Sequence, residues 1–196
     1  MNSAGSGQIE ALLAAAKAAG ARGAAPIERW NPPDCGEIDI RIATDGTWFH
    51  EGSPIGRMAL VRLFASVLGR ENGRYVLVTP AEKLGIRVDD APFLAVEMAV
   101  ESGEGGERLV FRTNLDDVIA CDAAHPLRFE PEPGTGGLRP YLHVRRDLWA
   151  RLTRPVYLDL VERAQEREVA GERVIGVASG GSFFPMAPAA VLDAAS

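Results

Sequence analysis

The sequence predicts an α+β protein of two related halves, each with the order strand, turn, helix and strand, and with an antiparallel sheet. Three observations predict this class. EIDIRI at 37–42 alternates apolar and polar residues, with the period of a half-buried strand. PIGRMALVRLFASVLG repeats apolar residues at helical spacing from Pro54 to Gly69. Apolar runs at 93–101 and 108–113 flank the Gly-rich SGEGGE, which is typical of an antiparallel hairpin.

The N-terminal elements follow from their boundary residues. Residues 8–19 are Ala-rich and read as a short helix that ends at Gly20. Asp45-Gly46 favours a turn, and Ser53 can accept a hydrogen bond from the exposed amides of a helix that starts at Pro54. The run RYVLVTP reads as a strand. Its Thr79, with Glu82, has the spacing of a capping box, which predicts one short helical turn.

The C-terminal part is richer in strands. We predict a helical segment, or two, around Pro155 within RDLWARLTRPVYLDLVERAQERE, and a surface loop at 130–137. Further short strands are predicted at IRV, DVIAC, LRFE, YLHVR, RVIGVAS and SFFPM.

A spacing repeat predicts that the halves are copies of one unit. Trp48 precedes Pro54 by the same interval as Trp149 precedes Pro155, and a strand comes before each tryptophan while a helix and an apolar strand come after it. We therefore predict an N-terminal α+β domain with a leading helix over 1–85, and a β-rich domain with one main helix over 86–196.

Composition excludes several classes of protein. With 46% hydrophobic and 24% charged residues, the chain of 196 residues has the make-up of a soluble globular protein. No apolar run is long enough to span a bilayer, and no basic stretch precedes an N-terminal apolar segment, so we predict a cytoplasmic protein. The net charge of −6 disfavours a nucleic-acid binder. The two cysteines have no CxxC spacing, and the three histidines have no HxxxH spacing, so we predict no metal and no cofactor.

Longer strings carry a resemblance to a known family. RWNPPDCGEIDIRIATDGTWFHEGSPIGRMALVRLFASVL, YVLVTPAEKLGIRVDDAPFLAVEM, FRTNLDDV and PYLHVRRDLWARLTRPVYLDLV together resemble the bacterial family called domain of unknown function 1285, over roughly 26–186. The resemblance implies a duplicated α+β arrangement, a C-terminal half similar to pleckstrin-homology-like folds, and a binding site where the halves meet. It also implies a role in signal transduction, without an established ligand or activity.

The stretch DGTWFHEGSPIGR gathers groups that catalysis uses. His50 with Asp45 or Glu51 could act as an oriented base in a hydrolase, and Ser53 could act as a nucleophile. The competing interpretation is a turn in which Trp48 packs and Ser53 caps a helix, because triads are usually assembled from distant segments. We favour the turn and predict no catalytic residues.

Basic residues cluster between 139 and 154, beside Tyr141 and Trp149, whereas 82–107 is acidic. Guanidinium groups bind carboxylates and phosphates and stack on aromatic rings, which suits an anionic ligand, an acidic peptide or RNA. The alternative is that these arginines pair with the acidic stretch. The cluster consists of Arg139, Arg145, Arg146, Arg151 and Arg154.

The leading hypothesis is therefore a cytoplasmic binding or sensor protein that recognises an anionic ligand or an acidic partner at the junction of its halves. The alternatives are a hydrolase that uses His50, and a protein that binds single-stranded RNA. The predicted ligand-binding residues are Trp48, His50, Arg57, Thr79, Lys83, Arg112, Asn114, Tyr141 and Arg145.

Overall fold

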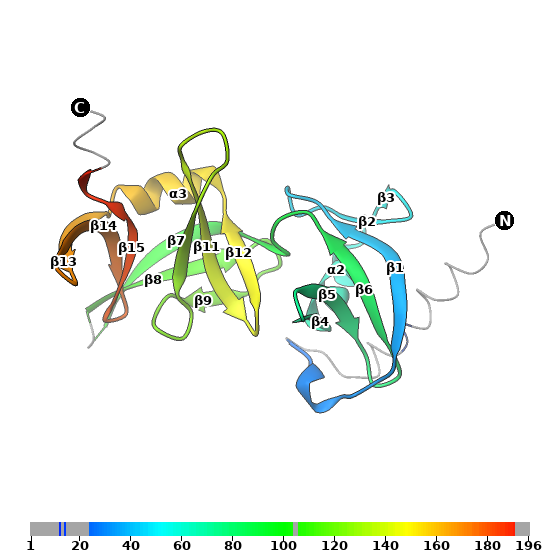
Figure 1. Ribbon diagram of the computed structural model, residues 1–196. Coiled ribbons are helices and arrows are strands. Elements are labelled where there is room, and N and C mark those ends of the chain that lie inside the picture. Colours follow the sequence, from blue (N-terminus) through cyan, green and yellow to red (C-terminus); the bar gives the residue numbers. More distant parts are fainter. Residues whose placement is uncertain (1–11, 13, 15–23, 104–105, 191–196) are drawn as a thin grey trace. The chain divides into compact units, whose positions relative to one another are not determined.

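The computed structural model describes residues 12, 14, 24–103 and 106–190, and it divides into two compact units, Met1–Pro92 and Phe93–Ser196 (Figure 1). We call these unit 1 and unit 2. Strands dominate both, so the α+β class is confirmed. Except for Leu12 and Ala14, the predicted helix over 8–19 lies outside the described residues. Within the described part of the chain, no helix is long and apolar enough to cross a membrane.

Unit 1 contains one six-stranded sheet of order β3-β2-β1-β6-β5-β4. Its central strands β1 and β6 are parallel, and the other neighbours are antiparallel. The elements are η1 (Ile27–Arg29), β1 (Asp34–Ile42), β2 (Trp48–His50), β3 (Ser53–Pro54), α2 (Met58–Ser66), β4 (Leu68–Glu71), β5 (Arg74–Val78) and β6 (Lys83–Val88).

The core of unit 1 forms where the sheet meets α2. The predicted alternation of β1 is confirmed, because Ile38, Ile40 and Ile42 are buried while the residues between them are more exposed. Trp48 is 1% exposed and stacks on Phe64 of α2, with ring centroids 6.3 Å apart. Burial of apolar surface on this side of the sheet is the main term that stabilises the unit.

The predicted start of the helix at Pro54 is wrong, because α2 begins at Met58 with Arg57 at its N-cap. Ser53 and Pro54 form the short strand β3, which pairs with β2. The reason lies in the preceding turn, where Glu51 and Gly52 have φ of 47° and 75°. Two consecutive positive φ values are typical of a tight hairpin turn, which returns the chain to β2 before a helix can start.

The predicted helical turn after Thr79 is also absent. Thr79 is fully buried, and its Oγ1 accepts hydrogen bonds from the N–H groups of Ala81 and Glu82. The N–H of Thr79 donates to the carbonyl oxygen of Glu82, which closes a turn between β5 and β6. The threonine therefore has the local bonding of a cap, but it closes a hairpin instead of starting a helix.

Unit 2 contains a six-stranded sheet of order β10-β11-β12-β7-β8-β9, which is strongly curved in Figure 1, and a three-stranded sheet of order β13-β14-β15. The elements are β7 (Phe93–Gly103), β8 (Gly106–Thr113), β9 (Val118–Ala120), β10 (Leu127–Pro131), β11 (Leu138–Arg145), β12 (Leu148–Leu152), α3 (Arg154–Val161), β13 (Gln165–Val169), β14 (Glu172–Ser179) and β15 (Ser182–Pro188).

The region predicted as helical around Pro155 is helical only in its middle. Pro155 lies in the first turn of α3, as expected, but Leu148–Leu152 is the strand β12 and Gln165–Val169 is the strand β13. In β12, Leu148, Ala150 and Leu152 are buried and the residues between them are half-buried. This period of two overrides the helical propensity of the segment.

The two six-stranded sheets share one topology. Each consists of two three-stranded meanders, and in each the first strand of the unit lies parallel to the last, β1 beside β6 and β7 beside β12. The helix differs in position, since α2 follows the third strand of unit 1 whereas α3 follows the sixth strand of unit 2. The predicted sequence repeat pairs the wrong residues, because Trp48 lies in the second strand of its sheet and Trp149 in the last strand of its own.

The three-stranded sheet is joined to the large sheet of unit 2 through Ser179. The Ser179 hydroxyl accepts a hydrogen bond from the N–H of Leu109 on β8, at 2.8 Å, and donates one to the carbonyl oxygen of Cys121, at 2.6 Å. All of these groups are buried. One side chain thus satisfies a donor and an acceptor that would otherwise be buried without partners.

The two cysteines differ in their surroundings, and this difference gives a first prediction. Cys35 is exposed, whereas Cys121 is fully buried, and burial raises the pKa of the Cys121 thiol to about 12. Because the thiolate is the reactive form, we expect a maleimide reagent at neutral pH to modify Cys35 quickly and Cys121 only after unfolding. Mass spectrometry of digested protein, with and without denaturant, measures this directly. Rapid modification of Cys121 in the native protein would contradict the burial.

Candidate functional site

In unit 1, the structure places two predicted ligand-binding residues inside the fold. Trp48 lies in the core, and Thr79 closes a turn with a fully buried side chain. Arg57 is exposed at the N-cap of α2, where its carbonyl oxygen accepts from the N–H groups of Leu60 and Val61. Of these three side chains, only that of Arg57 faces solvent.

The hydrolase hypothesis needs His50 to be hydrogen-bonded to Asp45 or Glu51, and no such bond joins these described residues, although His50 and Ser53 are cross-strand partners. Asp45 accepts a hydrogen bond from the N–H of Thr47, and this bond holds the pKa of the Asp45 carboxyl below its usual value. His50 lies on β2 opposite Ile40 and Ser53, and the hydrogen bonds of the described residues include none from its ring to a carboxylate. An oriented base has a partner group within hydrogen-bond reach, and none of the described carboxylates is hydrogen-bonded to His50.

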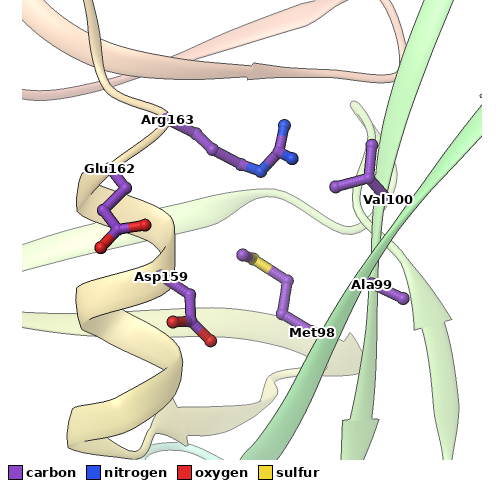
Figure 2. A pocket seen from close by; sticks show the side chains of 6 residues that line it. All are labelled: Met98, Ala99, Val100, Asp159, Glu162 and Arg163. Carbon is purple, nitrogen blue, oxygen red and sulfur yellow. The ribbon is translucent and has the colours of Figure 1, made fainter.

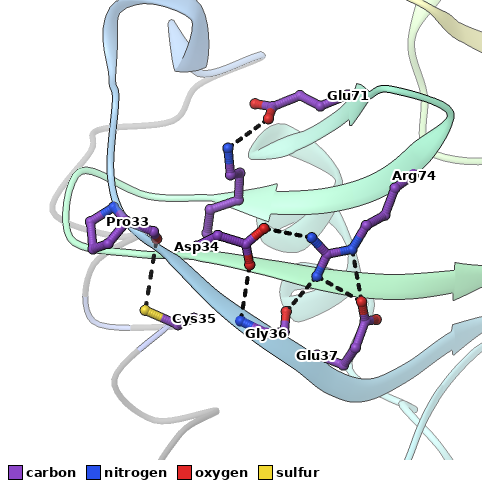
Figure 3. A network of polar contacts seen from close by, with 8 residues as sticks. Pro33, Asp34, Cys35, Gly36, Glu37, Glu71 and Arg74 are labelled. Atoms are coloured by element: carbon purple, nitrogen blue, oxygen red, sulfur yellow. Dashed lines mark hydrogen bonds and ion pairs between the residues drawn. The ribbon is translucent and has the colours of Figure 1, made fainter.

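Figure 3 shows a polar network in unit 1 that the sequence did not indicate. Arg74 on β5 donates to Asp34, to Glu37 and to the carbonyl oxygen of Gly36 at the start of β1, each at 2.7 Å. Hydrogen bonding from the Gly36 N–H and from Arg74 lowers the pKa of the Asp34 carboxyl. The network thereby ties β5 to β1 across β6. The Arg74 guanidinium therefore has internal partners on β1.

The glycine beneath this network explains how it fits. A Cβ at Gly85 on β6 would lie 2.3 Å from Glu37 Oε1 and 2.4 Å from Arg74 Nη2. Only a residue without a side chain leaves that space to the ion pair. The predicted ligand residue Lys83 lies nearby on the same strand, and its Nζ bonds Glu71 Oε2 at 2.6 Å.

In unit 2, the predicted residues near the ends of β7 and β8 are also engaged within the protein. Arg112 forms a bidentate ion pair with Glu97 and a further contact with Asp116, and these bonds raise the pKa of the Arg112 guanidinium. The Asn114 side-chain oxygen accepts a hydrogen bond from the N–H of Leu94 and the Asn114 N–H donates to the carbonyl oxygen of Leu94, so Asn114 ties the β8–β9 turn to the start of β7.

Arg145 likewise has an internal partner. Its Nη1 lies 2.9 Å from Asp117 Oδ2, and its guanidinium carbon lies 4.9 Å from the centroid of the Phe93 ring. Arg145 therefore forms an internal ion pair, but not with the acidic stretch 82–107 that was predicted as the alternative partner.

One sheet face brings together residues of the predicted basic and aromatic cluster, of which Tyr141 was also a predicted ligand-binding residue. The register of β10, β11 and β12 places Arg128, Tyr141 and Arg151 in one row across the three strands. The Arg128 guanidinium carbon lies 4.2 Å from the Trp149 ring centroid and 5.3 Å from the Tyr141 ring centroid. Both distances are within the range of cation–π contacts. We call the set Arg128, Arg139, Tyr141, Trp149 and Arg151 the arginine face.

Glu130 and Glu132 lie close to the arginines of this face. Glu132 lies 3.4 Å from Arg139 and 3.5 Å from Arg151, so one carboxylate is shared by two guanidinium groups at long range. Glu130 lies 3.1 Å from Arg128, and the side chain of Arg128 is 41% exposed. The arginines of this face are partly exposed, while Tyr141 between them is buried.

Two histidines continue the row of rings. His143 packs edge-on against Trp149, with centroids 5.1 Å apart, and stacks on His125 at 5.5 Å. The Nδ1 of each histidine lies close to a backbone carbonyl oxygen. Packing between the rings and contacts with backbone carbonyl oxygens therefore fix the orientation of both histidines. Among the described residues, no group of three or more His, Cys, Asp or Glu side chains could hold a metal ion.

The sequence identified part of the arginine face and missed the rest. Arg139, Tyr141, Trp149 and Arg151 belonged to the predicted basic and aromatic cluster, but Arg128 did not. The alternation of LRFE shows that Arg128 and Glu130 share a side of their strand. It does not show which neighbouring strand lies opposite, because cross-strand register depends on contacts distant in sequence.

Comparisons with known proteins agree over nearly the whole chain. Residues 25–91 match the family model "Domain of unknown function (DUF1285), N-terminal domain", and residues 92–186 match "Protein of unknown function (DUF1285), C-terminal domain". No curated protein matches the chain.

Two solved structures are similar to this one. The crystal structure of a DUF1285 family protein from Silicibacter pomeroyi DSS-3 is 45% identical, with a TM-score of 0.83, and the match covers 93% of this chain and 97% of that one. The crystal structure of a DUF1285 family protein from Shewanella baltica OS155 is 27% identical, with a TM-score of 0.51, and the match covers 63% of this chain and 90% of that one.

Proposed function

The chain belongs to the DUF1285 family, a family of unknown function, and from its structure we propose that it is a cytoplasmic binding or sensor protein that recognises an anionic ligand or an acidic protein segment through the arginine face of unit 2. The observation that carries this proposal is the row formed by Arg128, Tyr141 and Arg151 beside Trp149. The earlier prediction that such a site lies at the junction of the halves stays a prediction.

The chemistry of the arginine face suits an anion. A guanidinium group binds a carboxylate or phosphate with two parallel hydrogen bonds, and an aromatic ring beneath it fixes the plane of the group. At Arg128, the rings of Trp149 and Tyr141 provide that support. Because the orientation exists before binding, less side-chain entropy is lost when the anion arrives.

The contacts of Glu132 with Arg139 and Arg151 are long, so an anionic ligand can take the place of the Glu132 carboxylate. Ion pairs between half-exposed groups contribute only about 0 to 1 kcal/mol, so an incoming carboxylate or phosphate can replace Glu132 beside Arg139 or Arg151 at small cost. We also propose that unit 2 is related to pleckstrin-homology-like folds, since a strongly curved sheet of two meanders precedes α3. This resemblance concerns the fold alone and does not indicate which ligand is bound.

Calorimetric titration with inorganic pyrophosphate and with an acetylated hexaglutamate peptide tests the proposal. We expect at least one probe to bind, with an affinity that falls as salt increases. Arg128→Gln and Arg151→Gln should each weaken that binding about tenfold, because a hydrogen-bonded charge pair at an interface is lost. Tighter binding of the peptide than of pyrophosphate would identify an acidic protein segment as the preferred class.

The matched control is Arg173→Gln, which removes an exposed arginine that pairs with Glu166 on the three-stranded sheet. We expect this variant to bind both probes as the unaltered protein does. If neither probe binds, or if the variants at Arg128 and Arg151 behave like the control, the arginine face is not an anion site.

A further inference from the structure

The strand β7 has an open edge within unit 2. On one side it pairs with β8 from Ala95 to Gly103. On the other side β12 pairs only with residues 93–95, after which the chain turns into α3. In the part of the chain that the structure describes, no strand pairs with the remainder of this second edge. Such an edge presents backbone donors and acceptors that can accept a further strand.

The hydrogen bonds of β8 show which groups point to the open edge. The N–H and C=O of Leu109 are used by Ser179 and Cys121, which lie on the side away from β7. Leu109 and its partner Val100 therefore form a non-hydrogen-bonded pair, in which both residues direct their backbone groups outward. The N–H and C=O of Val100 thus face the open edge, and the period of two places those of Met98 there as well.

A pocket of about 590 Å³ lies along this edge, between β7 and the C-terminal end of α3 (Figure 2). Met98, Ala99 and Val100 line it from the strand. Successive side chains of a strand point to opposite faces, so a pocket on one face would contact only alternate residues. Contact with three consecutive residues shows that the pocket borders the edge of β7 itself. Its volume is within the range of ligand-binding clefts.

The helix side of the pocket is acidic. Asp159 of α3 and Glu162, the C-cap residue directly after the helix, line the pocket, and no hydrogen bond or ion pair joins either carboxylate to a described residue. Arg163 also lines it, but its Nη1 lies 3.3 Å from Glu107 Oε2. The pocket therefore offers two carboxylates, one guanidinium group that is paired with Glu107, the apolar side chains of Met98 and Val100, and a row of backbone groups.

From these features we propose that an extended, basic segment of a partner protein binds along β7 as an added strand. Its backbone pairs with Met98 and Val100, and a lysine or arginine side chain reaches Asp159 and Glu162. Strand addition gives affinity through main-chain hydrogen bonds and specificity through alternate side chains. A second copy of this chain fits less well, because it would bring another α3 with the same carboxylates to the same edge.

A short acetylated peptide of alternating valine and lysine, in which each residue type can face one side of a strand, is the probe. We expect fluorescence anisotropy to show binding to the full chain, and hydrogen–deuterium exchange to slow at the amides of Met98 and Val100. The charge reversals Asp159→Lys and Glu162→Lys should each weaken binding about tenfold. Glu101→Lys is the matched control, since Glu101 lies on β7 but does not line the pocket.

Two further results decide between the proposal and its competitors. An analogue of the peptide that is N-methylated at alternate residues should lose binding, because it cannot donate main-chain hydrogen bonds. Equal binding by this analogue, the absence of binding by the parent peptide, or unchanged exchange at Met98 and Val100 would overturn the proposal. So would a dimer, measured by light scattering, in which these amides are already protected without peptide.

Discussion

Replacing Ser179 with alanine is expected to lower the free energy of unfolding of unit 2 by about 2 to 6 kcal/mol, because the N–H of Leu109 and the carbonyl oxygen of Cys121 both lose their buried partner. Each buried group left without a hydrogen bond costs about 1 to 3 kcal/mol. The loss should fall on the contact between the three-stranded sheet and β8 and β9. Denaturant unfolding measures the total.

Ser182→Ala is the matched control for this prediction. Ser182 lies opposite Ser179 in the β14–β15 pairing, is only half-buried, and makes no side-chain hydrogen bond with a described residue. We expect this variant to be nearly as stable as the unaltered protein. Hydrogen–deuterium exchange locates the effect, since amides of 165–188 should exchange faster in Ser179→Ala while those of unit 1 stay unchanged. Equal stability of the two variants would show that the Ser179 hydroxyl is dispensable.

The strands were largely predictable because burial on one face leaves a period of two in the sequence. This holds for 37–42, for the β7–β8 hairpin and for most short strands of unit 2. The helix boundaries were less predictable. Pro54 and Ser53 have the composition of a helix start, yet the tight turn at Glu51-Gly52 uses them as a strand. The secondary structure that a short segment adopts depends on the geometry of the neighbouring turn as much as on the propensity of its own residues.

The topology and the site depend on register, which a single sequence does not reveal. The interval between Trp48 and Pro54 recurs at Trp149 and Pro155, but the strands that hold the tryptophans are not equivalent in the two sheets. The same limitation hid the row of Arg128, Tyr141 and Arg151, whose members come from three strands. The acids that pair with Arg112 and Arg145 could be identified only once the order of the strands in the sheet was known.

Replacing Trp48 with alanine is expected to lower the free energy of unfolding of unit 1 by about 3 to 5 kcal/mol, because the substitution leaves a large cavity beside Phe64. The side chain is almost entirely buried, so the cost is one of packing. Denaturant unfolding, followed by the near-ultraviolet circular dichroism of the aromatic side chains, measures it. Exchange of amides across β1, β2 and β6 should accelerate together.

Trp48→Phe separates packing from recognition at this position. The indole Nε1 of Trp48 is buried and has no hydrogen-bond partner among the described residues, so phenylalanine removes volume without breaking a bond. We expect most of the stability lost in Trp48→Ala to be retained, because an aromatic ring can still stack on Phe64. Binding of pyrophosphate or hexaglutamate should be the same for Trp48→Phe and the unaltered protein. A fully stable Trp48→Phe that no longer bound either probe would restore Trp48 as a ligand-binding residue, as the sequence first suggested.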